Sequence, residues 1–375
     1  MIHISKLSLI NTILLSNIFI IIFILFTNKI FLLKISIKTF IIFGILILLR
    51  IFLPVEFLFT KEIESFNIYP YIINLLKHKF YITQYLYFNL KQLLLFFWLT
   101  VTVIIIINKL FLYINIRNNL SNLPETKNLY YINILNNIKK QKQIKFNIKL
   151  LVNKSIPAVM EYGFFNKVIL IPENVYSTKE LNYILLHEIS HFLNRTNFIK
   201  LFIDILCSIF WWNPIMSIFK KKCYSLLEIH CDYIVTKDLS IWDKKEYLLC
   251  LLKHIKQNFT LINSSNSNII SYFFNYKSKN TLKNRFYLVM NFKKNKILEY
   301  IIITVSILLF ISSYFVILQP AYKPDVDINL QNINNYDYFI NYENNKYILY
   351  IDKEPIITFN SKEEIYKLGL TLKGE

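Results

Sequence analysis

Four long apolar stretches divide the chain and predict helices that cross a membrane. They lie at residues 7–26, 39–59, 93–114 and 297–318. Each is close to the roughly 20 apolar residues that a helix needs to span the hydrocarbon core of a bilayer. Residues 115–296, between the third and fourth stretches, are polar enough to fold as a domain in water. The pattern therefore predicts an α-helical membrane protein with about four transmembrane helices and one inserted α+β domain.

The remaining segments are a loop and a small tail. Residues 60–92 mix charged side chains with Tyr and Phe, which suit a membrane interface. In the tail, residues 319–375, two β-rich runs at 346–350 and 355–359 predict a β-hairpin. Ser361 and Glu364 then predict a capping box that opens a short helix. The expected domains are residues 1–114 with three spans and an extracytoplasmic loop at about 60–92, the inserted domain at 115–296, the fourth span at 297–318, and a small extracytoplasmic tail.

The distribution of charge predicts which side of the membrane each segment faces. The chain is 54% hydrophobic and 18% charged, with a mean hydropathy of +0.38, which indicates a multi-pass membrane protein. Lys and Arg outnumber Asp and Glu in residues 115–296, whereas the acids predominate in the tail. Because cytoplasmic loops carry the excess of Lys and Arg, we expect the inserted domain inside and both the N-terminus and the tail outside. The net charge of +19 follows this bias, and no module for direct nucleic-acid binding is evident.

Two further features constrain the interpretation. Arg50 lies within the second apolar stretch, so we expect its guanidinium to reach an interface or to face other helices. The four cysteines, Cys207, Cys223, Cys231 and Cys250, show no C-x-x-C spacing and all lie in the inserted domain. This distribution of cysteines fits reduced thiols in a cytoplasm.

The inserted domain contains a His-Glu-x-x-His motif, formed by His187, Glu188 and His191. On a helix the two histidines are one turn apart on one face, so both can bind one metal ion. Two imidazoles suit Zn²⁺, and Glu188 lies beside them, where it can deprotonate a water molecule. Ser177 and Glu180 predict the capping box that starts this helix. A purely structural histidine pair is the alternative.

A third metal ligand is expected further along the chain. Glu228 and Asp232 are again four residues apart on a predicted helix. Glu228 can complete the coordination of the ion, while Asp232 can accept the N–H of a metal-binding imidazole and orient it. His230 is the rival ligand, but it lies two residues from Glu228 and so points to another face of the helix.

Three other segments of the inserted domain have a predicted structure. Residues 144–152 and 167–172 are expected to form strands, the second directly before the metal helix. That second strand is either an ordinary core strand or one that pairs with an extended substrate backbone. Residues 198–218 are very apolar and contain Trp211-Trp212-Asn213-Pro214, which predicts either a membrane-embedded or interfacial helix or a buried core helix.

Several of these stretches, in the same order, resemble the BlaR1/MecR1-type membrane metallopeptidases of peptidase family M56. They are residues 48–54, 163–172, 186–191, 212–214 and 228–232. The resemblance covers roughly residues 30–318 and is most specific in the last of these stretches. It implies a gluzincin-like zinc endopeptidase domain in the cytoplasm, with His187, His191 and Glu228 as ligands and Glu188 as the base.

The resemblance also implies a role in signalling. Family members cleave themselves and a cytoplasmic transcriptional repressor when an external signal arrives. The best-known members carry an extracellular penicillin-binding domain with a Ser-x-x-Lys motif. The tail of this chain has no such motif, and Ser217-Ile218-Phe219-Lys220 falls in the predicted cytoplasmic domain. We therefore do not expect a β-lactam sensor here.

Other readings remain open at this point. A membrane protease of the CAAX-processing or HtpX type, acting in protein quality control, also uses His-Glu-x-x-His with a later Glu and Asp. A non-enzymatic membrane transducer is the second alternative, although it would not need Glu188. The expected partners are the lipid bilayer and a protein substrate; a homo-oligomer is left open. Tyr224, His230 and backbone N–H groups are the candidates for stabilising an oxyanion.

Overall fold

The computed structural model of the chain divides it into two units. The first comprises Met1–Ile63 and Asn74–Leu318, and the second comprises Glu64–Ile73 and Gln319–Glu375. The structure describes residues 2–3, 6–57, 60–65, 72, 75–76, 78–81, 87–121, 123–153, 156, 159–173, 176–262, 279–320, 338–343, 346–351 and 354–359. The helix predicted to start at Ser361 lies outside these residues.

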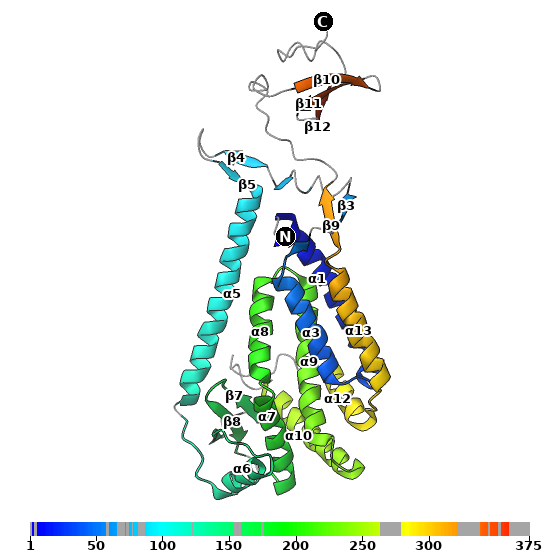
Figure 1. Ribbon diagram of the computed structural model, residues 1–375. Helices are drawn as coiled ribbons and strands as arrows, with labels where there is room; N and C mark the ends of the chain where they lie inside the picture. Colours follow the sequence, from blue (N-terminus) through cyan, green and yellow to red (C-terminus); the bar gives the residue numbers. More distant parts are fainter. Residues whose placement is uncertain are drawn as a thin grey trace. The chain divides into compact units, whose positions relative to one another are not determined.

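Helices make up most of the first unit (Figure 1). They are α1 (Lys6–Phe26), α2 (Lys29–Leu32), α3 (Ile37–Phe52), α5 (Leu90–Ser121), α6 (Leu129–Gln141), α7 (Thr178–Leu193), α8 (Thr196–Ile209), α9 (Pro214–Thr236), α10 (Ile241–Ile262), α12 (Lys279–Asn291) and α13 (Lys296–Ser312). Short strands lie between them. These are β1 (Ile2–His3), β2 (Glu56–Phe57), β3 (Lys61–Ser65), β4 (Lys79–Tyr81), β5 (Tyr87–Asn89), β6 (Ile148–Asn153), β7 (Met160–Tyr162), β8 (Lys167–Pro172) and β9 (Val316–Pro320).

Four helices, α1, α3, α5 and α13, fall on the four predicted spans, but two of them are shorter than predicted. α3 ends at Phe52 rather than Phe59, because Pro54 disfavours helical backbone at Leu53, where φ is −112° and ψ is 77°. α13 ends at Ser312, where the hydroxyl groups of Ser312 and Ser313 donate to carbonyls one turn back. Among the described residues, one helix, Leu90–Leu120, is long and apolar enough to cross a membrane, with a mean hydropathy of 2.3.

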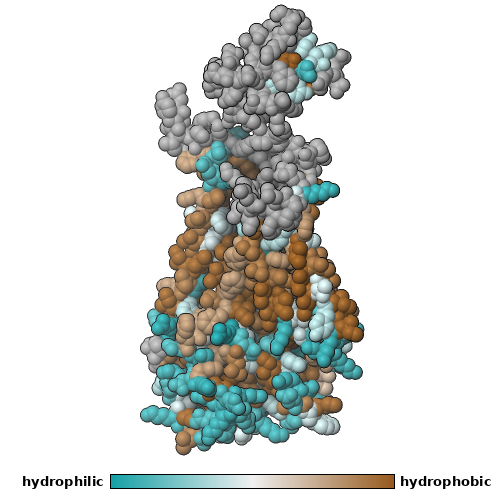
Figure 2. All heavy atoms as spheres, viewed as in Figure 1, coloured by the Kyte–Doolittle hydropathy of each residue, from teal (hydrophilic) through white to brown (hydrophobic). Residues whose placement is uncertain are grey.

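The apolar helices pack around a core of their own. Phe23 of α1 contacts Phe40 and Phe43 of α3 and Phe219 of α9 through ring edges, with centroids 5.2–6.3 Å apart. Arg50 is buried and donates from Nη1 to Thr12 Oγ1 at 2.9 Å, so it faces the other helices as expected. Apolar side chains cover the middle of this unit, and polar ones gather at the end that holds α6, α7 and α10 (Figures 1 and 2).

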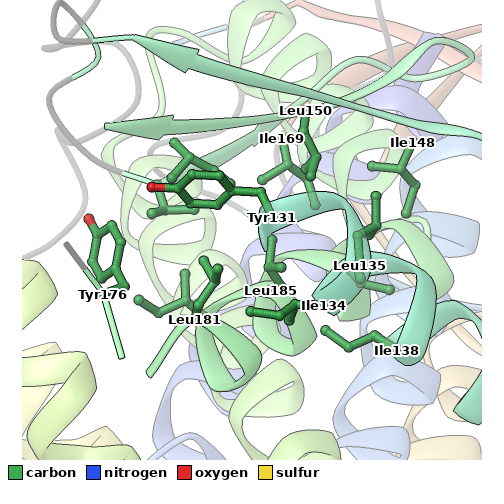
Figure 3. Packing of buried hydrophobic residues seen from close by; sticks show 14 of the residues in the cluster. Tyr131, Ile134, Leu135, Ile138, Ile148, Leu150, Ile169, Tyr176, Leu181 and Leu185 are labelled. Carbon is green, nitrogen blue, oxygen red and sulfur yellow. The ribbon is translucent and has the colours of Figure 1, made fainter. Parts of the chain in front are cut away.

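A three-stranded sheet in the order β6-β8-β7 supports the metal helix. β6 runs parallel to β8, and β7 runs antiparallel to it. The predicted strand at residues 144–152 begins only at Ile148, whereas the one at 167–172 is found as predicted. Leu150 and Ile169 of the sheet pack with Leu181 and Leu185 of α7 and with Ile138 of α6 in one buried cluster (Figure 3). This cluster holds α7 against the sheet.

The second unit contains the predicted hairpin of the tail. β11 (Lys346–Ile351) and β12 (Glu354–Phe359) pair antiparallel as expected. A third strand, β10 (Tyr338–Glu343), which the pattern did not predict, pairs with β11 on its other side. The tail sheet is therefore three-stranded, with β11 at its centre.

Candidate metal centre

The metal motif lies on α7, whose start is fixed by the predicted capping box. The Ser177 hydroxyl accepts from the N–H of Glu180 at 3.2 Å, and the Glu180 carboxylate accepts from the N–H of Ser177 at 2.9 Å. Two turns further on, His187 and His191 are both buried, with ring centroids 5.0 Å apart. The helix ends beyond them, where Arg195 adopts a left-handed conformation with φ of 52°. The motif therefore sits on a well-terminated helix with both imidazoles on one face.

Helix α9 brings Glu228 to the two histidines. Its carboxylate places Oε2 3.7 Å from His187 Nε2 and Oε1 3.8 Å from His191 Nε2. One ligand atom from each of the three residues lies within 4.8 Å of the other two. Ligand bonds of 2.0–2.2 Å in a tetrahedral zinc site separate donor atoms by about 3.4 Å. The donor set suits a zinc ion, and the two distances from Glu228 exceed the spacing of zinc ligands by only a few tenths of an ångström.

A network behind His187 fixes the orientation of its ring. Nδ1 lies 3.3 Å from Asp232 Oδ1 and 3.1 Å from the hydroxyl of Tyr247, which itself donates to Asp232 at 2.5 Å. Arg285 of α12 donates to both Asp232 oxygens, at 2.6 and 2.7 Å. These partners place the proton on Nδ1 and leave Nε2 as the metal-binding nitrogen. Although burial raises the pKa of Asp232, the Arg285 guanidinium outweighs it and holds that pKa well below its usual range.

His191 is oriented by a different set of partners. Its Nδ1 lies 3.0 Å from the hydroxyl oxygen of Thr196 and 3.3 Å from Cys231 Sγ. Thr196 donates its own proton to the His191 carbonyl at 3.2 Å, so its oxygen accepts from Nδ1–H. Burial and the Lys200 charge lower the pKa of His191 well below its usual value, which keeps the ring in the neutral form that a metal ligand requires.

The charges around His187 favour a cation between the three donors. Burial lowers the pKa of this imidazole, but its hydrogen bonds with Asp232 and Glu228 outweigh the burial and raise the pKa to about 9. A proton and a metal ion compete for the same nitrogen, so the carboxylates that attract the proton also attract the metal.

Glu188 and Glu161 form a second cluster of possible ligands with His191. Glu188 is buried on α7, and a carboxylate oxygen of Glu161, on β7, comes within 4.8 Å of ligand atoms of both Glu188 and His191. Burial raises the pKa of Glu161 to about 8. One of its oxygens, Oε2, is buried without a hydrogen-bond partner. Strand β7 thus contributes a carboxyl group to the centre that the sequence motif did not reveal.

A cavity of about 520 Å³ opens beside Glu228. Its lining joins α5, β7, α8 and α9, and it includes Glu161, Lys200, Tyr224 and Arg285. The Lys200 ammonium lies 3.4 Å from Glu228 Oε1 and 3.6 Å from Glu161 Oε1. A volume of this size accommodates part of a peptide or a small ligand next to the three donors.

Not all of the candidate residues predicted from the sequence lie in the metal centre. The structure brings His187, Glu188, His191, Glu228 and Asp232 together. His230 is on a different face of α9, where burial and the charge of Lys38 lower its pKa, and it is not among the clustered donors. Tyr224 lines the cavity, but its hydroxyl donates to the Lys200 carbonyl at 3.2 Å.

The prediction for strand β8 needs one correction. Of the two structures that the sequence allows for residues 167–172, pairing with a substrate backbone is wrong, and a core strand is found. β8 is the central strand of its sheet and is hydrogen-bonded on both sides. The edge strand beside the metal helix is β7, which contacts α7. The same sheet therefore offers β7, rather than β8, as the edge next to the site.

Five residues of the centre were not predicted. One is Thr196, which is close to His191 in the chain, and the other four are Glu161, Lys200, Tyr247 and Arg285. These four come from β7, α8, α10 and α12, outside both motif helices. No spacing rule connects them with the histidines, since long-range packing brings them together. The only sequence signal was indirect: a buried Asp232 requires a cationic partner.

Comparison with known proteins agrees with this arrangement. A family model described as BlaR1 peptidase M56 matches residues 78–289, more than half of the chain. The chain therefore belongs to the BlaR1-type M56 peptidase family, a family of metallopeptidases. This membership favours the M56 interpretation over the CAAX-processing or HtpX type.

The chain is similar to several curated proteins. It is 28% identical over 252 residues to regulatory protein BlaR1 of Staphylococcus aureus, covering 62% of this chain and 42% of that protein. It is 27% identical over 157 residues to regulatory protein BlaR1 of Bacillus licheniformis, covering 41% of this chain and 25% of that protein. It is also 30% identical over 117 residues to the methicillin resistance mecR1 protein of Staphylococcus epidermidis, covering 30% of this chain and 20% of that protein. The match thus spans less than half the length of each of these relatives.

Proposed function

We propose that this protein is a membrane-embedded zinc endopeptidase that acts in signal transduction. The observation that carries the proposal is the convergence of His187, His191 and Glu228 beside Glu188 in a chain of the M56 family. Its substrates would be the chain itself, a cytoplasmic regulator such as a transcriptional repressor, or both. The similarity to regulatory protein BlaR1 supports the regulatory role.

The residues divide into three tasks in this mechanism. His187, His191 and Glu228 would hold the zinc, with Asp232 and Thr196 orienting the two imidazoles. The bound zinc supplies a Lewis acid that polarises water and the scissile carbonyl. Glu188 takes a proton from the attacking water and can pass it to the leaving amine.

Lys200 is our candidate for stabilising the negative charge that develops on the substrate carbonyl. It lines the cavity and reaches Glu228 and Glu161 only at 3.4 and 3.6 Å, so its ammonium can still serve a third acceptor. Arg285 is committed to Asp232 through two short bonds, and the Tyr224 hydroxyl is bonded to a backbone carbonyl. Lys200 is therefore preferred over Tyr224 and His230 for this task.

The substrate backbone would lie in an extended form along β7. This strand is at the edge of the sheet, contacts α7 and carries Glu161 into the centre. An extended peptide added to such an edge gains main-chain hydrogen bonds without requiring a particular sequence. This arrangement supports cleavage within a chain rather than at its end.

We further propose that α1, α3, α5 and α13 cross the cell membrane and that α8 and the start of α9 dip into it. α8 carries half-exposed apolar side chains at 198, 201, 202 and 205, which a buried core helix would not show. At the turn between α8 and α9, the side-chain amide nitrogen of Asn213 donates to the side-chain oxygen of Asn17 on α1 at 2.7 Å. Trp98 of α5 donates to the Ile209 carbonyl, also at 2.7 Å. These contacts with α1 and α5 support a position of the α8–α9 turn among the proposed spans.

The proposed topology has the peptidase domain in the cytoplasm and the tail outside. It follows from the excess of Lys and Arg in residues 115–296 and its reversal in the tail. Reporter fusions at Lys140 and at Asn345 should therefore report opposite sides of the membrane. Reporters on the same side would show that one of the four spans is miscounted.

The proposed activity is tested by removing the metal. Protein purified into lipid vesicles should cleave itself or a co-expressed repressor, lose this cleavage on treatment with a chelator, and regain it on addition of Zn²⁺. A protein that keeps cleaving at the same rate after its metal has been removed would not be a metallopeptidase of this kind. Circular dichroism before and after chelation controls for unfolding.

A further inference from the structure

The turn between β7 and β8 presents aromatic side chains outward. Gly163 starts this turn with φ of +96°, and a Cβ there would lie 1.9 Å from the Asn166 carbonyl oxygen, so the turn is tight. Two phenylalanines, Phe164 and Phe165, follow it. Phe165 is 86% exposed, the largest exposure among the apolar side chains of the described residues. A phenylalanine held in water at the tip of a tight turn is unfavourable unless the tip meets an apolar phase.

The tip is held against the first turn of α8. The Phe164 and Phe165 rings lie with their centroids 5.1 and 5.8 Å from that of Phe198. Asn197 donates to the Gly163 carbonyl at 3.2 Å, which ties the backbone of the turn to the same helix. On the α5 side, Tyr113 contacts Phe164 at 5.6 Å between ring centroids. The turn is thus fixed to two helices that carry exposed apolar surface.

These contacts make the tip continuous with a longer apolar surface. Phe198, Leu201, Phe202 and Ile205 of α8 recur at intervals of three and four residues and are all 40–42% exposed. They form one face of the helix that starts at the tip and runs along the proposed span α5, and two of them, Leu201 and Ile205, also border the cavity beside Glu228. A surface of this kind, with one end at an aromatic cluster, suits the boundary between hydrocarbon and headgroups.

Cationic residues lie near the tip along the chain, although the ammonium of one of them, Lys167, lies over the Phe146 ring. Lys167 follows the turn, Arg195 directly precedes α8, and Arg117 lies one turn beyond Tyr113 on α5. Both arginines are exposed. Aromatic side chains flanked by Lys and Arg are typical of segments that enter the interface of a membrane with anionic lipids.

We propose that the β7–β8 turn inserts Phe165 into the cytoplasmic leaflet of the membrane, with the half-buried Phe164 packed behind it against Tyr113 and Phe198. This inference rests on the proposed membrane crossing of α5. The insertion anchors β7, and with it Glu161, so that the metal centre is held at the level of the headgroups. A substrate, whether the chain itself or a cytoplasmic regulator, would then be cleaved at the membrane surface.

Photocrosslinking to lipid tests this proposal in the full-length protein. The photoreactive analogue p-benzoylphenylalanine replaces Phe165, and the protein is reconstituted into vesicles of phosphatidylcholine and phosphatidylglycerol that contain an alkyne-tagged phosphatidylcholine. The same analogue replaces Ile104 in α5, 57% exposed and expected within the bilayer, and Lys140 in α6, exposed and expected in water. Because Phe165 is 86% exposed, the added benzoyl group of the analogue has room there, and the variant at position 165 should fold.

We expect lipid adducts at 165 and 104, with at least about tenfold more adduct at 165 than at 140, since burial of a phenylalanine favours the apolar phase by at least that factor. Adduct at 104 with only background at 165 would overturn the insertion but leave the proposed spans intact. Crosslinking at 165 to a second copy or to a substrate, without lipid, would assign the tip to that partner instead and also overturn it. Only background levels of lipid adduct at position 104 would contradict the membrane crossing of α5. Because the insertion rests on that crossing, this result would contradict the insertion as well.

Discussion

Replacing Glu188 with glutamine should lower peptide cleavage by about 10²–10⁴-fold, the usual contribution of general-base catalysis, while zinc stays bound. Glutamine has nearly the shape of glutamate but cannot accept the proton of the attacking water. Glu188 is not one of the three proposed ligands, so the substitution should leave the metal content near that of the wild type. Cleavage of the chain itself, or of a co-expressed repressor, is followed together with zinc content.

The control for this substitution is Glu246→Gln. Glu246 lies on α10 at the protein surface, where it pairs with the exposed Lys179. Because exposed ion pairs contribute little to stability, this variant should cleave at the wild-type rate. The comparison is made under conditions in which the wild type cleaves, since membrane helices can gate such a site. A Glu188→Gln protein that cleaves as fast as the wild type would remove Glu188 from its role as base.

Replacing Lys200 with methionine should lower kcat by about 10²–10³-fold, as loss of one donor to an oxyanion typically does. Methionine keeps the apolar stem of the side chain and removes only the charge and its hydrogen-bond donors. Lys200→Arg restores a cation in the same place and should recover part of the rate. KM should change much less than kcat, because the oxyanion exists only in the transition state and in the intermediate.

Lys220→Met separates this role from a general electrostatic effect of the cavity. Lys220 lines the same cavity but pairs with Asp204, away from the three metal donors. We expect this variant to keep its kcat. If Lys220→Met and Lys200→Met lose kcat equally, or if Lys200→Met keeps the wild-type kcat, Lys200 is not the oxyanion donor.

The part of the centre that the sequence predicted depends on short-range helix geometry. His187 with His191, and Glu228 with Asp232, are pairs at a spacing of four residues, and such pairs share a helix face wherever the helix lies. The capping box of Ser177 and Glu180 is equally local, and the structure has it as expected. The assignment of Glu228 as the third donor needed one further assumption, namely that α9 packs against α7 where Glu228 can reach the two histidines.

The remaining residues depend on packing that no local rule encodes. Arg285 is 53 residues from Asp232, and Glu161 reaches His191 from a strand that the pattern did not predict. Strand β8 was identified from its composition, but a run such as Val168-Ile169-Leu170-Ile171 does not show whether one edge or both edges will be paired. The ends of α3 and α13 were misplaced because apolar composition continues past the residues that stop the helices.

The central claim is that two imidazoles and one carboxylate hold a zinc ion, and X-ray absorption at the zinc edge tests it most directly. The purified wild type should contain about one zinc, with nitrogen and oxygen neighbours at 2.0–2.2 Å and no sulfur at about 2.3 Å. The absence of sulfur matters because Cys231 Sγ lies 3.3 Å from His191 Nδ1. The His191→Ala protein should lose most of its zinc. A sulfur ligand in the wild type, or full zinc in His191→Ala, would contradict the assignment.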